Sequence, residues 1–209
     1  MFYLFGSTRQ KEQQVELIEI MASNSFSNFN SQDDKGWTAI HRAAAFGTAE
    51  DVRALSRMGA ALDIRTHNLS WTPIFAAVCY NNLETMLEII KIEPLDKHEA
   101  DLRGWTLLHV AVGAGSFDVI PDLLRLGCDP AVLSNATGHS VPEVFIDIAV
   151  TPGDIAKACS KEVHNEWLQL LVKAGFATGE EFDGIDWDVK TANLQFGGCE
   201  CCERWSKTS

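Results

Sequence analysis

Basic residues are scarce in this sequence. Its 209 residues include 17 Lys and Arg against 29 Asp and Glu, so the formal net charge is −12. Nucleic acids and anionic membrane surfaces are bound through concentrated positive charge, to which an acidic chain is poorly suited. The sequence also lacks any run of roughly 18 apolar residues, the length that spans a bilayer. We therefore expect no nucleic-acid partner and no membrane insertion.

An export signal and the common catalytic motifs are missing as well. The apolar start, Met1 to Phe5, is short and has no basic region before it, unlike a secretory signal peptide. There is no glycine-rich phosphate loop, no Gly-x-Ser-x-Gly and no His-Glu-x-x-His. The carboxylates are scattered without the paired spacing typical of glycosidases. We expect an intracellular protein, cytoplasmic or nuclear, that is not an enzyme and binds no cofactor.

Cysteine is sparse until the end of the chain. Cys79, Cys128 and Cys159 stand alone, whereas Cys199, Cys201 and Cys202 form a cluster. The irregular spacing and the missing export signal favour reduced thiols. The cluster lacks the paired Cys-x-x-Cys spacing of zinc knuckles, so we expect no metal there. Metal binding by these three residues, a redox-active or acylated thiol, and no function at all remain alternatives.

The sequence does contain a repeat of 34 residues. Its markers are the tryptophans at the start of each copy and a glycine or asparagine ten residues later: Trp37, Trp71 and Trp105; Gly47, Asn81 and Gly115. Glycine and asparagine tolerate the left-handed conformation that ends helices, so an inner helix is expected to end at each of them. A second apolar-periodic segment follows each one and predicts an outer helix. Gly59 and Gly127 are expected to end two of these outer helices, whereas the second copy has Glu93-Pro94 instead.

This order of turn, Gly-x-Thr-Pro-Leu-His-like segment, helix, glycine and helix resembles the ankyrin-repeat family. The resemblance covers about residues 33–175. It implies an all-α solenoid in which each unit is a hairpin loop followed by two antiparallel helices. One such unit cannot bury both helices, so neighbouring units must stack.

The resemblance also assigns roles to two threonine–histidine pairs. Thr38 with His41, and Thr106 with His109, stand where family members have residues that hydrogen-bond to each other and to the neighbouring backbone. Catalytic and metal roles are therefore not expected for these histidines. In the second copy Phe75 replaces the histidine, so Thr72 is expected to lose its polar partner.

The repeats predict a domain organisation. Residues 1–32 are expected to be a degenerate N-terminal capping repeat, and the repeats to occupy 33–66, 67–100, 101–134 and 135–175. In the fourth repeat the helix-opening signature Thr151-Pro-Gly-Asp comes 11 residues late, which indicates an insertion near 139–150. This segment is either an extended finger carrying Phe145 or a distorted inner helix. Residues 176–209 are expected to form an acidic, cysteine-containing tail.

Family resemblance places partner contacts on the hairpin loops and the exposed face of the inner helices. The candidates are aromatic and apolar residues with two arginines beside them: Trp37, Phe46, Arg65, Leu69, Trp71, Tyr80, Arg103 and Trp105. Aromatic residues and arginine are favoured at interface hot spots. The tryptophans could instead pack against each other and the next loop, whereas Phe46 and Tyr80 are harder to explain by packing. The arginines hint at an acidic or aromatic-rich peptide partner.

The sequence thus predicts a monomeric protein-interaction scaffold or adaptor. The first alternative is a metal- or redox-responsive regulator that uses the C-terminal cysteine cluster. The second is a fragment of a larger multidomain ankyrin protein. Fold alone does not choose the partner or the pathway.

Overall fold

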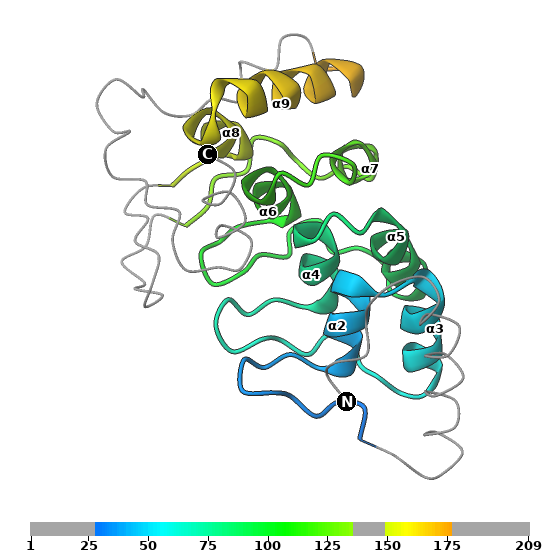
Figure 1. Ribbon diagram of the computed structural model, residues 1–209. Coiled ribbons are helices and arrows are strands. Elements are labelled where there is room, and N and C mark those ends of the chain that lie inside the picture. The colour runs from blue at the N-terminus through cyan, green and yellow to red at the C-terminus, as the bar shows by residue number, and fades with distance from the viewer. Residues whose placement is uncertain (1–27, 136–148, 177–209) are drawn as a thin grey trace. The chain divides into compact units, whose positions relative to one another are not determined.

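A computed structural model describes residues 28–135 and 149–176. These residues hold eight helices that follow one another in pairs (Figure 1). The chain divides into two compact units, residues 1–95 and 96–209. Most of the predicted N-terminal cap, the insertion within the fourth repeat and the tail with Cys199, Cys201 and Cys202 lie outside the described residues.

The first unit contains two helix pairs. The inner helices are α2 (Ala39–Phe46) and α4 (Pro73–Cys79), and the outer ones are α3 (Ala49–Arg57) and α5 (Leu83–Ile92). Helix α2 packs on α4 and α3 packs on α5, so two layers form (Figure 1). The surfaces between them bury the apolar side chains that the repeat predicts: Ile40, Val52, Leu55, Ile74, Met86 and Ile89. Each fully buried side chain of this size contributes about 1.5–3 kcal/mol.

The second unit repeats the arrangement. Helices α6 (Leu107–Ala114) and α8 (Pro152–Cys159) pack together, with α7 (Ile120–Arg125) beside α6 and α9 (Lys161–Lys173) beside α8. Its interior is formed by large side chains from all four helices: Leu108, Ile120, Leu123, Ile155, Trp167 and Leu171. The exposed side chains of α9 are polar except for Val172, which is 51% exposed.

A hairpin loop precedes each inner helix, and the same backbone bond closes all four. The N–H of the first residue donates to the carbonyl of the residue just before the helix-capping threonine, as in Asp33–Trp37, Thr66–Trp71, Asp101–Trp105 and Ser134–Val150. Three or four residues lie between the closing residues in the first three loops, and 15 in the last. Val150 thus takes the position that tryptophan holds in the other repeats, and residues 136–148 between the closing pair lie outside the described residues.

Two glycines allow neighbouring loops to touch. The Lys35 carbonyl accepts a bond from His67 N–H, and the Arg103 carbonyl accepts one from Asn135 N–H. A Cβ atom on Gly36 or Gly104 would lie 2.5 Å from those two nitrogens, and both glycines have positive φ angles. Only glycine fits such a position without displacing the next loop.

The helix ends agree with the sequence at most positions. Asn81, Gly115, Gly59 and Gly127 all adopt the left-handed conformation, and α5 ends at extended Glu93. Helix α2 also ends at Gly47 as expected, but this glycine is not left-handed, because its φ is −91°. A Cβ there would lie 2.7 Å from the Ala43 carbonyl oxygen, so space rather than handedness requires glycine.

Candidate functional site

The histidine of the first repeat is engaged in structural hydrogen bonds. His41 Nδ1 accepts from the Thr38 backbone N–H at 3.2 Å and lies 2.8 Å from the Thr38 hydroxyl. Its Nε2 lies 3.0 Å from the Trp71 carbonyl oxygen, which can only accept. Nε2 therefore carries the proton, and the ring is neutral. Burial is the largest cause that lowers the pKa of His41, to about 4.

The third repeat reproduces this arrangement. His109 Nδ1 accepts from the Thr106 N–H, and Nε2 donates to the Val150 carbonyl oxygen at 2.9 Å. Burial again lowers the pKa of the ring to about 4. Both imidazoles hold one hairpin loop to the next, so the predicted structural role is confirmed by the geometry.

The second repeat shows what is lost when phenylalanine replaces the histidine. The Thr72 hydroxyl is buried and has no hydrogen-bond partner among the described residues. Phe75 is fully buried and stacks on Trp71, with ring centroids 6.3 Å apart and planes 15° apart. Thr72 thus loses its polar partner, as the sequence predicts, whereas the contact between the tryptophan and the residue four positions on is kept.

Five of the eight predicted contact residues are buried instead of exposed: Trp37, Leu69, Trp71, Arg103 and Trp105. The three indoles pack against the residue four positions on, which is His41, Phe75 or His109. This burial favours the packing alternative for the tryptophans. Their contact with a partner stays a prediction.

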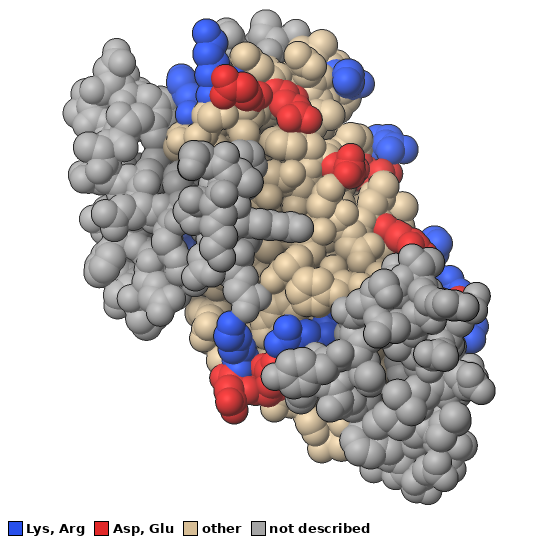
Figure 2. All heavy atoms as spheres, viewed as in Figure 1, with Lys and Arg blue, Asp and Glu red and all other residues tan. Residues whose placement is uncertain are grey.

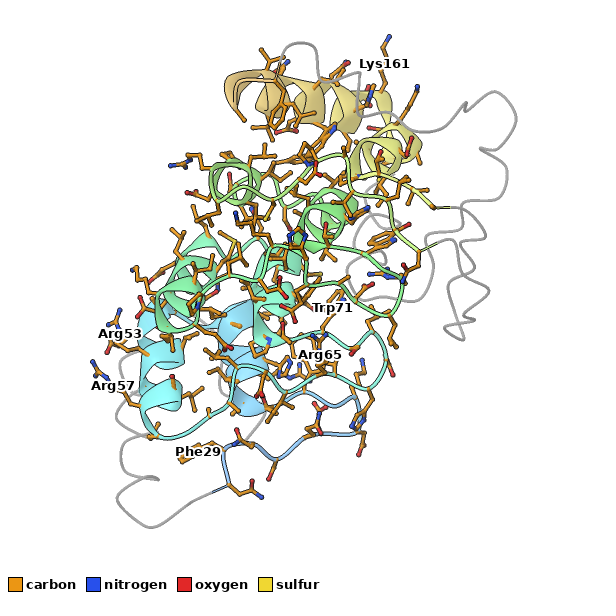
Figure 3. The ribbon with its side chains drawn as sticks, turned by 180° about the vertical axis from the view of Figure 1, so that it is seen from behind. Phe29, Arg53, Arg57, Arg65, Trp71 and Lys161 are labelled. Atoms are coloured by element: carbon orange, nitrogen blue, oxygen red, sulfur yellow. The ribbon has the colours of Figure 1, made fainter. Side chains whose placement is uncertain are left out.

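The two predicted arginines differ. Arg103 is buried on Asp101, with Nε and Nη2 of Arg103 2.9 and 2.6 Å from the same carboxylate oxygen. Its guanidinium carbon lies 3.8 Å from the centre of the Trp105 ring. Arg65 is exposed, and its Nη1 donates to the Ser70 carbonyl oxygen within the second hairpin, where Figure 3 shows it near Trp71.

Phe46 and Tyr80 come together on the surface of the first unit. Phe46 is the last residue of α2, and Tyr80 directly follows α4. Their ring centroids are 4.5 Å apart with an angle of 66° between the planes. Tyr80 also meets Trp37 edge to face at 6.3 Å. We call these three side chains the aromatic patch: Phe46 is 40% exposed, Tyr80 is half-buried, and Trp37, which contacts Tyr80, is 7% exposed.

One residue of this surface was missed in the sequence. Arg42 precedes Phe46 by four residues on α2, which places the two on neighbouring turns of one helix face. Its guanidinium carbon lies 4.7 Å from the centre of the Trp37 ring, and Nη2 donates to Asp33 at 3.0 Å. The spacing of four from Phe46 is the signal that could have identified it.

Asp33 fixes the arginine against the tryptophan. One carboxylate oxygen accepts from the backbone N–H of Lys35 and of Trp37, and the other accepts from Arg42. Burial opposes ionisation of Asp33, but these hydrogen bonds outweigh it and lower the pKa of the carboxyl. Within the first unit, Figure 2 shows charged side chains over the hairpin loops and over α5, and uncharged side chains over α4 between them.

The described residues contain no group of three or more His, Cys, Asp or Glu side chains that could hold a metal ion. Cys79 and Cys128 are buried, and burial raises the pKa of the Cys128 thiol to about 11. In the same residues no helix is long and apolar enough to cross a membrane.

Comparison with known proteins gives a family match. The model of a family described as ankyrin repeats (3 copies) matches residues 9–98 and 58–134. Together these ranges cover residues 9–134, which are 126 of the 209 residues.

Several curated proteins are similar over part of this chain. Alpha-latrotoxin-Lg1a of Latrodectus geometricus is 32% identical over 99 residues, which are 47% of this chain and 7% of the toxin. SMC5-SMC6 complex localization factor protein 1 of Homo sapiens is 32% identical over 128 residues, or 60% of this chain and 12% of that protein. Ankyrin repeat and SOCS box protein 3 of Bos taurus is 27% identical over 95 residues, or 44% and 18%. The chain thus spans less than a fifth of the length of each of these relatives.

Proposed function

Because the chain belongs to the ankyrin-repeat family, whose repeats mediate protein–protein interaction, we propose that its first unit binds a segment of a partner protein on the aromatic patch. The protein acts as a scaffold or adaptor, as a monomer inside the cell, and performs no catalysis. The observation that carries the proposal is the exposure of the Phe46 ring where three aromatic side chains meet.

The patch has the composition and support of an interface hot spot. Trp37 lies beneath Tyr80 and is held by Asp33, so the exposed rings rest on a rigid base. Rigid aromatic side chains lose little conformational entropy on binding, and such residues dominate measured interface energies. Tyr80 adds a phenolic oxygen, which can hydrogen-bond at the edge of an apolar contact.

The magnitude of the contact follows from the exposed area. Burying the exposed part of the Phe46 ring contributes about 1 kcal/mol, and the exposed part of Tyr80 about the same. Removing both rings is therefore expected to weaken partner binding roughly 30-fold, which corresponds to about 2 kcal/mol.

Affinity capture from a lysate of the source cells tests the proposal. The wild-type chain is compared with Phe46→Ala/Tyr80→Ala and with Ile92→Ala as the matched control. Ile92 is 38% exposed, nearly as much as Phe46, but it lies at the end of outer helix α5. Thermal unfolding of all three chains establishes that each is folded.

The expected result is a partner that the wild type and Ile92→Ala retain and that the double variant loses. If a folded double variant retains the partner as the wild type does, the aromatic patch is not the binding site. If only Ile92→Ala loses the partner, the binding site lies on the outer helices instead.

A further inference from the structure

We infer that the partner segment of the first unit carries a carboxylate beside its apolar anchor, and that Arg42 recognises this carboxylate. The inference rests on the proposed function and names the chemistry of the partner. It follows from the hydrogen bonds, exposure and position of Arg42.

The hydrogen-bonding capacity of Arg42 is largely unused. A guanidinium has five N–H donors, and in the described part of the chain Arg42 uses only Nη2, toward Asp33. Its Nε is buried without an acceptor. Its Nη1 makes no hydrogen bond to the described residues, and the side chain is 24% exposed.

Arg103 provides an internal comparison within the second unit. It too lies over a tryptophan ring and pairs with an aspartate that fixes its hairpin loop. However, Arg103 directs two nitrogens at that aspartate, and its side chain is only 4% exposed. Arg103 is thus closed within its loop, whereas Arg42 keeps an edge of its guanidinium at the surface.

The exposed edge of the Arg42 guanidinium lies beside the aromatic patch. The guanidinium lies on the Trp37 ring, one helical turn from Phe46, so it borders the aromatic patch. A carboxylate bound there would be partly shielded from water by the apolar partner residue beside it, and shielding strengthens a charged hydrogen bond. Arginine forms planar contacts of this kind with carboxylates more readily than lysine does.

Because the chain is strongly acidic, we expect the carboxylate of the partner to contribute to specificity more than to affinity. At −12 the protein repels an acidic segment at long range, so charge does not steer such a partner toward the patch. The apolar contact supplies most of the affinity, and Arg42 selects among apolar segments those with a suitably placed Asp or Glu.

A display library of random short peptides tests the inference on the full chain. Peptides selected on the wild type are synthesised, each with a matched version in which Asp or Glu is replaced by Asn or Gln. Their dissociation constants are measured for the wild type, Arg42→Gln, Phe46→Ala and Arg57→Gln. Arg57→Gln makes the same charge change on α3, from which the arginine points outward (Figure 3).

The expected peptides place Asp or Glu near an aromatic or aliphatic residue. Arg42→Gln should weaken them roughly 5- to 20-fold, while Arg57→Gln leaves them unchanged. The amide versions should bind wild type and Arg42→Gln equally, because the two changes remove the same contact.

Two results would overturn the inference. If the selected peptides need Phe46 but contain no acidic residue, or bind Arg42→Gln as tightly as the wild type, Arg42 does not recognise a carboxylate. The aromatic patch would then remain a binding site. If no peptide is selected, or none depends on Phe46, the proposed function fails as well.

Discussion

Lowering the pH from 7 to 5 should destabilise this fold through two buried histidines. His41 and His109 are neutral in the folded chain, and their folded pKa is about 4 against 6.5 for an unperturbed imidazole. The unfolded chain therefore binds protons that the folded chain excludes. Their stabilising effect is fully present above pH 6.5 and is lost as the pH falls toward 4.

The size of the effect follows from the two pKa values. At pH 5 each histidine costs about 2 kcal/mol of unfolding free energy relative to pH 7, and the two together cost about 4 kcal/mol. The carboxyls of Asp33 and Glu88 have lowered pKa values, so the stability that they contribute is lost below this pH window. The slope between pH 7 and 5 consequently reports on the two imidazoles.

Urea unfolding followed by tryptophan fluorescence at several pH values measures this slope. His41→Phe and His109→Phe are suitable variants, because Phe75 occupies the same position in the second repeat. Each substitution should remove about half of the loss between pH 7 and 5, whatever its effect at pH 7. A slope that both substitutions leave unchanged would refute the assignment of the buried neutral imidazoles.

Three further predictions concern the loops and the interior. Thr72→Val should be neutral or slightly stabilising in urea unfolding, because the buried Thr72 hydroxyl has no hydrogen-bond partner among the described residues. Thr38→Val should instead cost about 1–3 kcal/mol of unfolding free energy, because it removes the hydroxyl that donates to His41. Equal costs for the two variants would contradict this account. Gly104→Ala should cost about 1–2 kcal/mol more than Gly59→Ala, since both have positive φ angles but only Gly104 touches the next loop. Similar melting temperatures for the two variants would contradict it. The Cys128 thiol should resist alkylation at neutral pH until urea unfolds the chain, as peptide mass spectrometry can show; rapid labelling of the folded protein would contradict its raised pKa.

The features that repeat along the chain were predictable from the sequence. The tryptophan spacing of 34 residues, the threonine–histidine pairs and the glycine or asparagine at helix ends each carry their own local chemistry. The late start of the fourth helix pair was also visible, because Thr151 with Asp154 is a recognisable start of a helix. Such patterns depend only on residues close together in the sequence, so they can be recognised without knowledge of the fold.

The exposure of individual side chains was not predictable in the same way. Trp105 and Arg103 are buried because the Asp101 carboxylate holds both the backbone and the guanidinium of their loop. Gly47 is required by its close approach to a carbonyl and not by its φ angle. These outcomes depend on contacts that only the folded chain creates, as does the partly open state of Arg42.

The central claim is that a partner contacts the aromatic patch, and photo-crosslinking tests it directly. A photoactivatable phenylalanine analogue replaces Phe46 in one chain and Ile92 in another, and each is illuminated in the presence of the captured partner. Both positions are exposed to a similar degree, but one belongs to the inner and the other to the outer helices. We expect the partner to crosslink at position 46 and not at 92. Crosslinking at 92, or at neither position while the partner is bound, would contradict the account.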